Sequence, residues 1–197
     1  MLAAEHVLCY LRGTWNQTIR CARDPRANPN FVWGWVDADW AGDTDTRRSH
    51  IEYILMMNGG PFSWKSRRQD NVSLCTSEAK FVAASQAGQD AAYLRKTLTD
   101  FGFSRTKATL LYEDNLACVV MSENPVRRKF SCHIDIRKYY VHELVLNGSL
   151  KLVPLRTHQM VADALTKSLP SPTFVGHRHI MTGHASFAAR LLRCVGG

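Results

Sequence analysis

The chain has 197 residues, of which 45% are hydrophobic and 21% are charged, a composition typical of globular proteins and unlike that of disordered ones. No stretch approaches the ~18 consecutive apolar residues that a membrane-spanning helix needs. The N-terminal sequence MLAAEHVLCYLRGTWNQ also lacks the basic start and long apolar block of a signal peptide. We therefore expect one or two globular domains that are neither secreted nor anchored in a membrane.

Basic residues outnumber acidic ones by 25 to 17, which gives a formal net charge of +8. This excess favours a polyanionic partner, most often nucleic acid, with a merely basic protein as an equal alternative. The six cysteines are scattered without a CxxC pair. We therefore expect reduced thiols of an intracellular protein and no structural zinc site.

The first third of the chain predicts a helix followed by an antiparallel meander. Residues 3–12 place apolar side chains on one helical stripe that ends at Gly13, and a polar loop over residues 23–30 follows as a linker. Alternating patterns and a turn sequence then predict three strands over 31–36, 51–57 and 61–66, the last two joined by Asn58-Gly59-Gly60.

From Thr76 the pattern becomes helical, with an Ala-rich helix that ends at Gly102. The later segments predict a strand over 109–112, helices over 116–121 and about 135–146, a strand over 150–155 and a helix over 159–168. No clear pattern remains after Pro172. The order β-β-β-α-β-α-α-β-α predicts an α/β fold, a five-stranded mixed sheet with helices on both faces.

Four carboxylates stand at the ends or first turns of predicted elements: Asp37, Glu78, Asp114 and Asp163. Each alone is explained by turn or helix-dipole preferences. If the four converge, cations must neutralise them, and oxygen-only ligands suit Mg²⁺ or Mn²⁺. Asp39 is an alternative to Asp37, because alternation directs both side chains to the same face of a strand.

A series of short motifs occurs in order along the chain: VDADWAGD, RRS, GGPFSWKSRRQ, SEAKF, YEDN, NPV, HIDIR and ADALTKSL. From about Leu2 to Leu169 the chain resembles the ribonuclease H domain at the C-terminal end of copia-type LTR retrotransposon polyproteins. The resemblance implies a ribonuclease H-like fold in which 31–170 form the domain. It also implies that residues 1–30 are an N-terminal helix and linker, the tail of the segment that connects the domain to the reverse transcriptase. Residues 171–197 would form an irregular C-terminal tail.

The resemblance implies that the chain is an endonuclease that hydrolyses the RNA strand of RNA–DNA hybrids with two Mg²⁺ or Mn²⁺ ions during reverse transcription. It assigns the metal ligands to Asp37, preferred over Asp39, and to Glu78, Asp114 and Asp163. Asp37 would contact both ions, Glu78 and Asp114 one ion, and Asp163 the other. His158 is a candidate for assisting product release, with an exposed loop histidine as the alternative.

Basic clusters flank these positions and are candidate contacts to phosphates and sugars, with a merely solvated basic face as the alternative. The implied partners are an RNA–DNA hybrid and the reverse transcriptase part of the same polyprotein, with no membrane. The implied location is intracellular, in cytoplasmic virus-like particles, with the nucleus as an alternative. The candidate nucleic-acid-binding residues are Arg47, Arg48, Lys65, Arg67, Arg68, Asn115, Arg127 and Arg128.

The chain departs from the family pattern in three places. His50-Ile51-Glu52 stands where the family usually has a small residue and glycine, and Lys129–Cys132 where it has Arg-Thr-Lys. Lys80 stands in place of the usual second acid of SEAKF and adds positive charge near Glu78. These departures indicate a diverged copy, so the alternative function is a catalytically decayed or domesticated nucleic-acid-binding module of the same fold.

Overall fold

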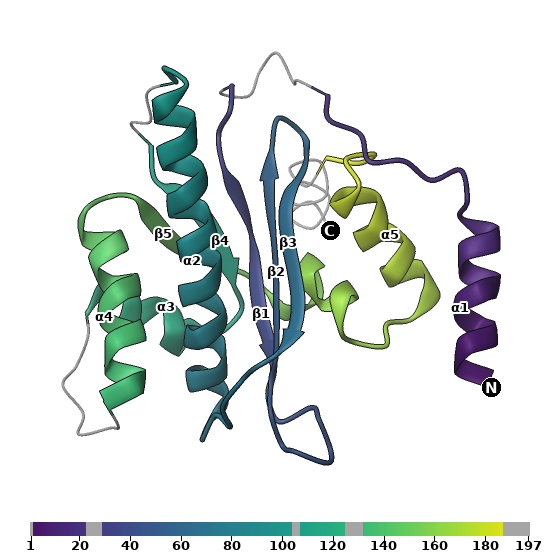
Figure 1. Cartoon of the computed structure of the whole chain (residues 1–197), viewed down its shortest axis with the longest axis horizontal. Helices are drawn as coiled ribbons and strands as arrows, with labels where there is room; N and C mark the ends of the chain where they lie inside the picture. Colours follow the sequence, from purple (N-terminus) through teal and green to yellow (C-terminus); the bar gives the residue numbers. More distant parts are fainter. Residues whose placement is uncertain (1, 23–28, 104–106, 125–131, 187–197) are drawn as a thin grey trace.

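The computed structural model describes residues 2–22, 29–103, 107–124 and 132–186. Its centre is a five-stranded sheet in the order β3-β2-β1-β4-β5 (Figure 1). β1 pairs antiparallel with β2 and β2 with β3, whereas β4 is parallel to both β1 and β5. The predicted five-stranded mixed sheet is therefore confirmed. The strands are β1 (Trp33–Asp39), β2 (His50–Met57), β3 (Gly60–Arg68), β4 (Thr109–Glu113) and β5 (Leu150–Pro154).

A two-residue turn joins β2 to β3, as the sequence predicts. Asn58 and Gly59 both have positive φ, 51° and 78°. Positive φ at both central residues is what a type I′ turn requires, and asparagine and glycine adopt it at least cost. This turn fixes the register of the hairpin and so determines which β2 side chains face β1.

Helices cover both faces of the sheet, as predicted. On one face, α2 (Thr76–Asp100), α3 (Leu116–Glu123) and α4 (Cys132–Leu146) pack against the sheet and bury residues such as Val36, Tyr53 and Leu111 (Figure 1). On the other face, Trp35 and Ile54 pack against a second core that includes Val161 and Ile180. Because strand residues alternate between the faces, Asp37 and Glu52 lie on the same face as Trp35 and Ile54.

The segment predicted as a helix over 159–168 instead forms two short 3₁₀ helices, η1 (Thr157–Gln159) and η2 (Val161–Leu165). Five consecutive residues, Gln159 to Asp163, are buried. An α-helix lying on a sheet buries one stripe rather than a continuous run, so the compact turns suit this segment better.

The C-terminal region also differs from the prediction of an irregular tail. α5 (Ser171–Met181) is a helix with proline in its first turn, where the fixed φ of proline is compatible with a helix. Ile180 packs into the same core as Trp35. Residues 187–197 lie outside the described part of the chain.

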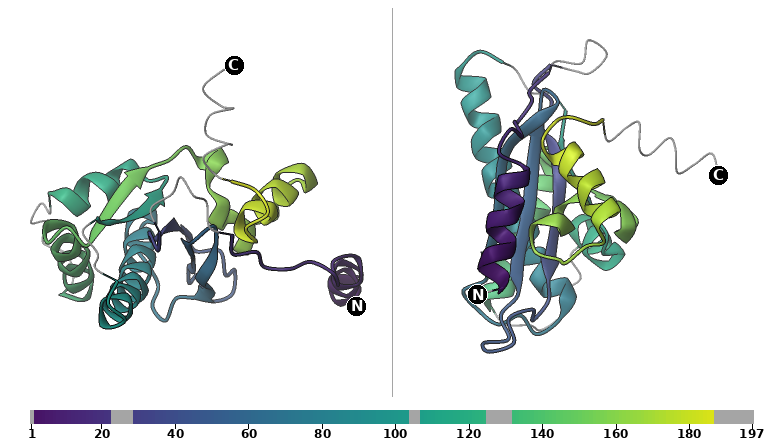
Figure 2. Two further views of the ribbon diagram at one scale, coloured as in Figure 1. Left: turned by 90° about the horizontal axis from the view of Figure 1, so that it is seen from above. Right: turned by 90° about the vertical axis from the view of Figure 1, so that its right-hand side faces the viewer.

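The N-terminal helix α1 (Leu2–Gly13) lies at the side of the molecule, next to α5 (Figure 2). Tyr10 contacts Phe174 of α5, with ring centroids 6.0 Å apart. Most of its apolar stripe stays exposed, including Val7, Leu8 and Leu11. Within the described residues, no helix is long and apolar enough to cross a membrane.

Candidate active site

Two of the predicted carboxylates lie at the same edge of the sheet. Asp37 is near the end of β1, and Asp114 directly follows β4. Because β1 and β4 are parallel neighbours, their carboxyl ends meet at this edge. The parallel pairing therefore brings together two residues that are 77 positions apart by the numbering of the chain.

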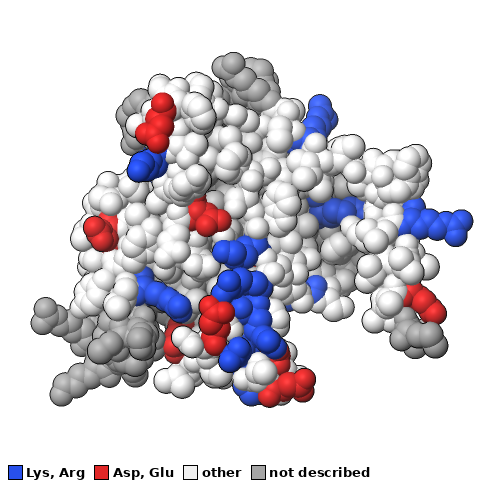
Figure 3. All heavy atoms as spheres, viewed as in Figure 1, with Lys and Arg blue, Asp and Glu red and all other residues white. Residues whose placement is uncertain are grey.

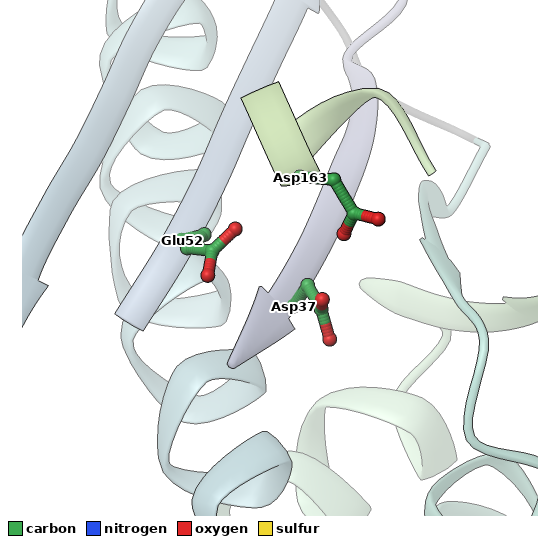
Figure 4. Close-up of side chains that lie close together, drawn as sticks. All are labelled: Asp37, Glu52 and Asp163. Atoms are coloured by element: carbon green, nitrogen blue, oxygen red, sulfur yellow. The ribbon is translucent and has the colours of Figure 1, made fainter. Parts of the chain in front are cut away.

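Asp37 belongs to a first group of three carboxylates, which we call the Asp163 cluster: Asp37, Glu52 and Asp163. Glu52 is the cross-strand partner of Asp37 in β2, and η2 places Asp163 over the two strands (Figure 4). One oxygen of each carboxylate lies within 4.8 Å of the others. All three side chains are buried, and both oxygens of Glu52 have no hydrogen-bond partner among the described residues.

Lys167 neutralises part of this cluster. Its Nζ donates to Asp37 Oδ2 at 2.5 Å and to Asp163 Oδ1 at 2.8 Å. The Lys167 side chain is 32% exposed, so its ammonium group reaches the cluster from the solvent side.

Asp37 also belongs to a second group, the Asp114 cluster: Asp37, Glu113 and Asp114. Here Lys80 of α2 provides the counter-charge. Its Nζ contacts Asp37 Oδ1, lies 2.5 Å from Asp114 Oδ1 and lies 3.4 Å from Glu113 Oε1. The Lys80 side chain is only 7% exposed, so this cation is enclosed among the three carboxylates.

The electrostatics follow from burial and from these two lysines. Burial alone would raise the pKa of Asp37, but the charges of Lys80 and Lys167 outweigh it and hold that pKa below its usual value. Burial raises the pKa of Glu52 and of Glu113 to about 8. Glu52 is therefore largely neutral at pH 7, whereas Asp37 is charged and held by the two ammonium groups.

Burial also raises the pKa of Asp163, to about 6, although the hydrogen bond from Lys167 opposes this. For Lys80, burial would lower the pKa, but the charges of Glu113 and Asp37 raise it above the usual value. Lys80 therefore stays a cation across the physiological pH range.

Of the four predicted ligands, the structure brings together Asp37, Asp114 and Asp163 but not Glu78. The Glu78 carboxylate instead accepts a hydrogen bond from the Leu74 backbone N–H, at 2.7 Å. This corrects the expectation that Glu78 joins the cluster. Residues 78 and 80 lie about 200° apart around a helix, at 100° per residue, so a side chain at 80 faces the sheet edge when one at 78 does not.

Sequence reasoning did not select Glu52 and Glu113. The available signal for Glu52 was an acid inside the apolar run IEYILMM, and for Glu113 its position beside Asp114 at a strand end. For the Asp37/Asp39 alternative, the structure brings Asp37 into both clusters, whereas Asp39 is in neither among the described residues.

A groove of about 920 Å³ borders the two clusters. Asp114 and Asp163 line it, together with His158 and Arg156 from the segment before η2. His158 is exposed. The groove therefore gives a large ligand access to carboxylates of both clusters.

Basic side chains gather around the end of β3 (Figure 3). Several already have partners: Arg67 pairs with Asp70 at 2.6 Å and Arg68 with Asp43 at 2.5 Å. Arg47 is exposed and Arg48 half-buried. Beside Lys65, Trp64 is 54% exposed and adds an aromatic surface.

Of the other four candidates for nucleic-acid contact, two have side-chain hydrogen bonds within the domain and two lie outside the described residues. The Nζ of Lys65 donates to Gln86 on α2, at 3.1 Å. Asn115 caps α3, because its side chain accepts a hydrogen bond from the Cys118 backbone N–H at 3.1 Å. Arg127 and Arg128 lie outside the described residues.

Comparison with known proteins gives relatives over nearly the whole chain. It is 33% identical over 184 residues, 93% of its length, to the retrovirus-related Pol polyprotein from transposon TNT 1-94 of Nicotiana tabacum. It is 31% identical over 87% of its length to that from transposon RE1 of Arabidopsis thaliana. The chain spans 14% and 12% of these two relatives, so it corresponds to one part of a much longer polyprotein. No family model matches the chain.

The fold is that of ribonuclease H. LC11-RNase H1 is an enzyme isolated from compost by a metagenomic approach, and its structure superposes on this chain with a TM-score of 0.53 at 14% identity. The superposition covers 69% of this chain and 92% of the LC11 chain. The same enzyme in complex with an RNA/DNA hybrid superposes with a TM-score of 0.50 at 11% identity, covering 68% and 92%. Relatives and fold agree with the motifs in the sequence: this chain belongs to the retrovirus-related Pol polyproteins encoded by retrotransposons, as a part that has the ribonuclease H fold.

Proposed function

We propose that this domain binds RNA–DNA hybrids and hydrolyses their RNA strand during reverse transcription of a retrotransposon, inside the cell. The observation that carries the proposal is the convergence of Asp37, Asp114 and Asp163 beside one groove. Carboxylates gathered in this way are suited to hold the divalent cations used in phosphodiester hydrolysis. The related LC11 enzyme, whose structure includes an RNA/DNA hybrid, supports the choice of substrate.

The Asp163 cluster is the better of the two clusters for a divalent cation. Both clusters offer only oxygens, but in the Asp163 cluster both Glu52 oxygens lack a hydrogen-bond partner among the described residues, and Lys167 is exposed enough to turn toward solvent. Asp37, Glu52 and Asp163 would therefore hold Mg²⁺ or Mn²⁺. A cation there would supply charge stabilisation for the reacting phosphate and acidify a bound water.

The remaining residues would position the substrate. We assign phosphate contacts to the basic residues near the end of β3, and foremost to Arg47, which is exposed and has no ion-pair partner among the described residues. Contacts of this kind are independent of sequence and sensitive to salt. His158, exposed at the wall of the groove, is assigned to assist product release.

A second function is favoured by one observation. The ammonium group of Lys80 lies among the carboxylates of the Asp114 cluster, so this copy of the domain would lack one of the two cation positions that the family resemblance implies. A domain that binds hybrids without cutting them would keep the groove and the basic surface while losing the chemistry. The reverse transcriptase part of the polyprotein is the partner proposed in both cases, with α1 as the connection to it.

The deciding experiment is cleavage of a labelled RNA–DNA hybrid in Mg²⁺ or Mn²⁺, compared with duplex DNA of the same sequence. Under the first proposal, the RNA strand is cut, duplex DNA is not, and Asp163→Asn, which removes a proposed ligand of the cation, loses the activity. Hybrid binding without cleavage supports the second function. Absence of hybrid binding at low salt contradicts both.

A further inference from the structure

The Lys80 ammonium group is surrounded by carboxylate oxygens. It contacts Asp37 Oδ1, lies 2.5 Å from Asp114 Oδ1 and lies 3.4 Å from Glu113 Oε1. Lys80 lies in the first turns of α2, and its side chain is only 7% exposed. A buried ammonium group needs such partners, because an unpaired charge is very costly in a protein interior.

The same three residues form an oxygen cluster that otherwise suits a metal ion, with one oxygen of each within 4.8 Å of the others. The nitrogen of Lys80 and a divalent cation would compete for these oxygens. Both are positive, and at such short separation their repulsion is large in a buried site. The Asp114 cluster therefore does not fit a divalent cation while Lys80 is present.

The Asp163 cluster differs in two respects. Its lysine, Lys167, is 32% exposed, so its ammonium group can move into water. Glu52 is fully buried, and neither of its oxygens has a hydrogen-bond partner among the described residues. This cluster therefore contains a buried glutamate that lies close to both Asp37 and Asp163 (Figure 4).

We infer that Lys80 acts as a built-in cation in place of one of the two divalent ions expected for this site, so that the domain binds a single ion, in the Asp163 cluster. The inference deepens the proposed function and rests on it for the reaction. The number of bound ions follows from the geometry of the two clusters alone.

The position of residue 80 allows a test in which a substitution there should add a second bound cation. Because the side chain at 80 reaches Asp37 and Asp114, glutamate at that position would add a fourth carboxylate to the Asp114 cluster and remove its ammonium group. Lys80→Glu should then create the second cation position. Glu78→Gln is the matched control in the same turn of α2, because the Glu78 carboxylate bonds to the Leu74 backbone and lies outside both clusters among the described residues.

The experiment counts bound Mn²⁺ by electron paramagnetic resonance at equilibrium, with melting temperature as a second readout. We expect one ion for the wild type and for Glu78→Gln, and two for Lys80→Glu, whose melting temperature should rise by several degrees more on adding Mn²⁺. Because Lys80→Glu gathers four acids and can fail to fold without metal, Lys80→Gln is measured in parallel. It removes the ammonium group without adding an acid and should also bind a second, weaker ion.

Two ions in the wild type, or no second ion in either Lys80 variant, would overturn the inference. Hybrid binding in EDTA is measured on the same samples. If no protein, including the wild type, binds the hybrid, the proposed function is contradicted. The ion counts still test the inference independently. A gain of hybrid cleavage in Lys80→Glu would support both.

Discussion

Lys80 and Asp37 are 43 residues apart in the chain, and their side chains form a buried ion pair at the edge of the sheet. Asp37 also accepts a hydrogen bond from Lys167, at 2.5 Å. One aspartate therefore balances two ammonium groups and joins the Asp163 and Asp114 clusters. Replacing any of these three residues should change both the stability and the ion binding of the domain.

The first prediction concerns Asp37. Asp37→Asn removes the carboxylate shared by two lysines and leaves Lys80 buried with fewer counter-charges. Breaking a buried ion pair from one side costs about 3–5 kcal/mol, so the free energy of unfolding should fall by about 3 kcal/mol. Asp39→Asn, half-buried on the same strand and outside both clusters, should change it by less than about 0.5 kcal/mol. Urea denaturation in EDTA tests this, and equal effects of the two variants would contradict it.

The second prediction concerns pH. Burial raises the pKa of Glu52 to about 8, so between about pH 4.5 and pH 8 the folded chain keeps a proton that the unfolded chain has released. Stability should therefore fall as pH rises through this window, by at most about 1.4 kcal/mol per pH unit for this group. Glu113, whose pKa is also about 8, contributes in the same direction.

Glu52→Gln should reduce this pH dependence, because the amide does not titrate. The measurement is urea denaturation of both proteins in EDTA at several pH values from 5 to 8. A wild type whose stability rises over this range, or a variant with an unchanged slope, would show that Glu52 is ionised in the folded state.

The third prediction concerns Lys167, which competes with a cation for Asp37 and Asp163. Partly exposed ion pairs are worth up to about 1 kcal/mol, so Lys167→Gln should raise Mn²⁺ affinity by about fivefold. Lys151→Gln, an exposed lysine on β5, is the control and should leave the affinity unchanged. Titration calorimetry measures both, and weaker binding by Lys167→Gln would mean that this lysine supports the ion instead.

The fourth prediction concerns hybrid binding. Arg47 is exposed, and the described residues include no ion-pair partner for it, whereas Arg68 is held by Asp43 at 2.5 Å. Arg47→Gln should weaken hybrid binding and reduce the slope of log affinity against log salt by about 0.9, the change expected for one lost phosphate contact. Arg68→Gln should change the slope by less than half as much. Fluorescence anisotropy at several salt concentrations tests this, and the reverse order would place the nucleic acid nearer to Arg68 than to Arg47.

The fifth prediction concerns α1. Its side chains remain largely exposed, and within the described part of the chain Tyr10 makes a ring contact with Phe174 of α5. Removing residues 1–13 should therefore change the melting temperature by less than about 2 °C, since a loss of 1 kcal/mol lowers it by about 2–4 °C in a domain of this size. A larger decrease, measured by calorimetry, would give α1 a role in the core instead of in docking to the polymerase.

Much of this architecture could be predicted from the sequence alone. Alternation over residues 31–36 and the turn residues Asn58 and Gly59 predict a meander, because side-chain period and positive φ are local properties of the chain. Asp37 and Asp114 could be predicted as neighbours, because each ends a strand and strand ends meet at a sheet edge. The structure bears out both expectations.

Only the tertiary structure decided which other residues complete the site. Glu52 faces Asp37 because of the antiparallel register between β1 and β2, and a shift of one residue would turn it to the opposite face. Lys80 rather than Glu78 reaches Asp37 because the rotation of α2 against the sheet sets which side of the helix is buried, and that rotation is fixed by packing. Asp163 lies in η2, a 3₁₀ helix of five residues, which is too short to show a periodic apolar pattern in the sequence. Local pattern therefore determined the strands and their terminal acids, whereas register, helix rotation and packing decided that two lysines balance those acids.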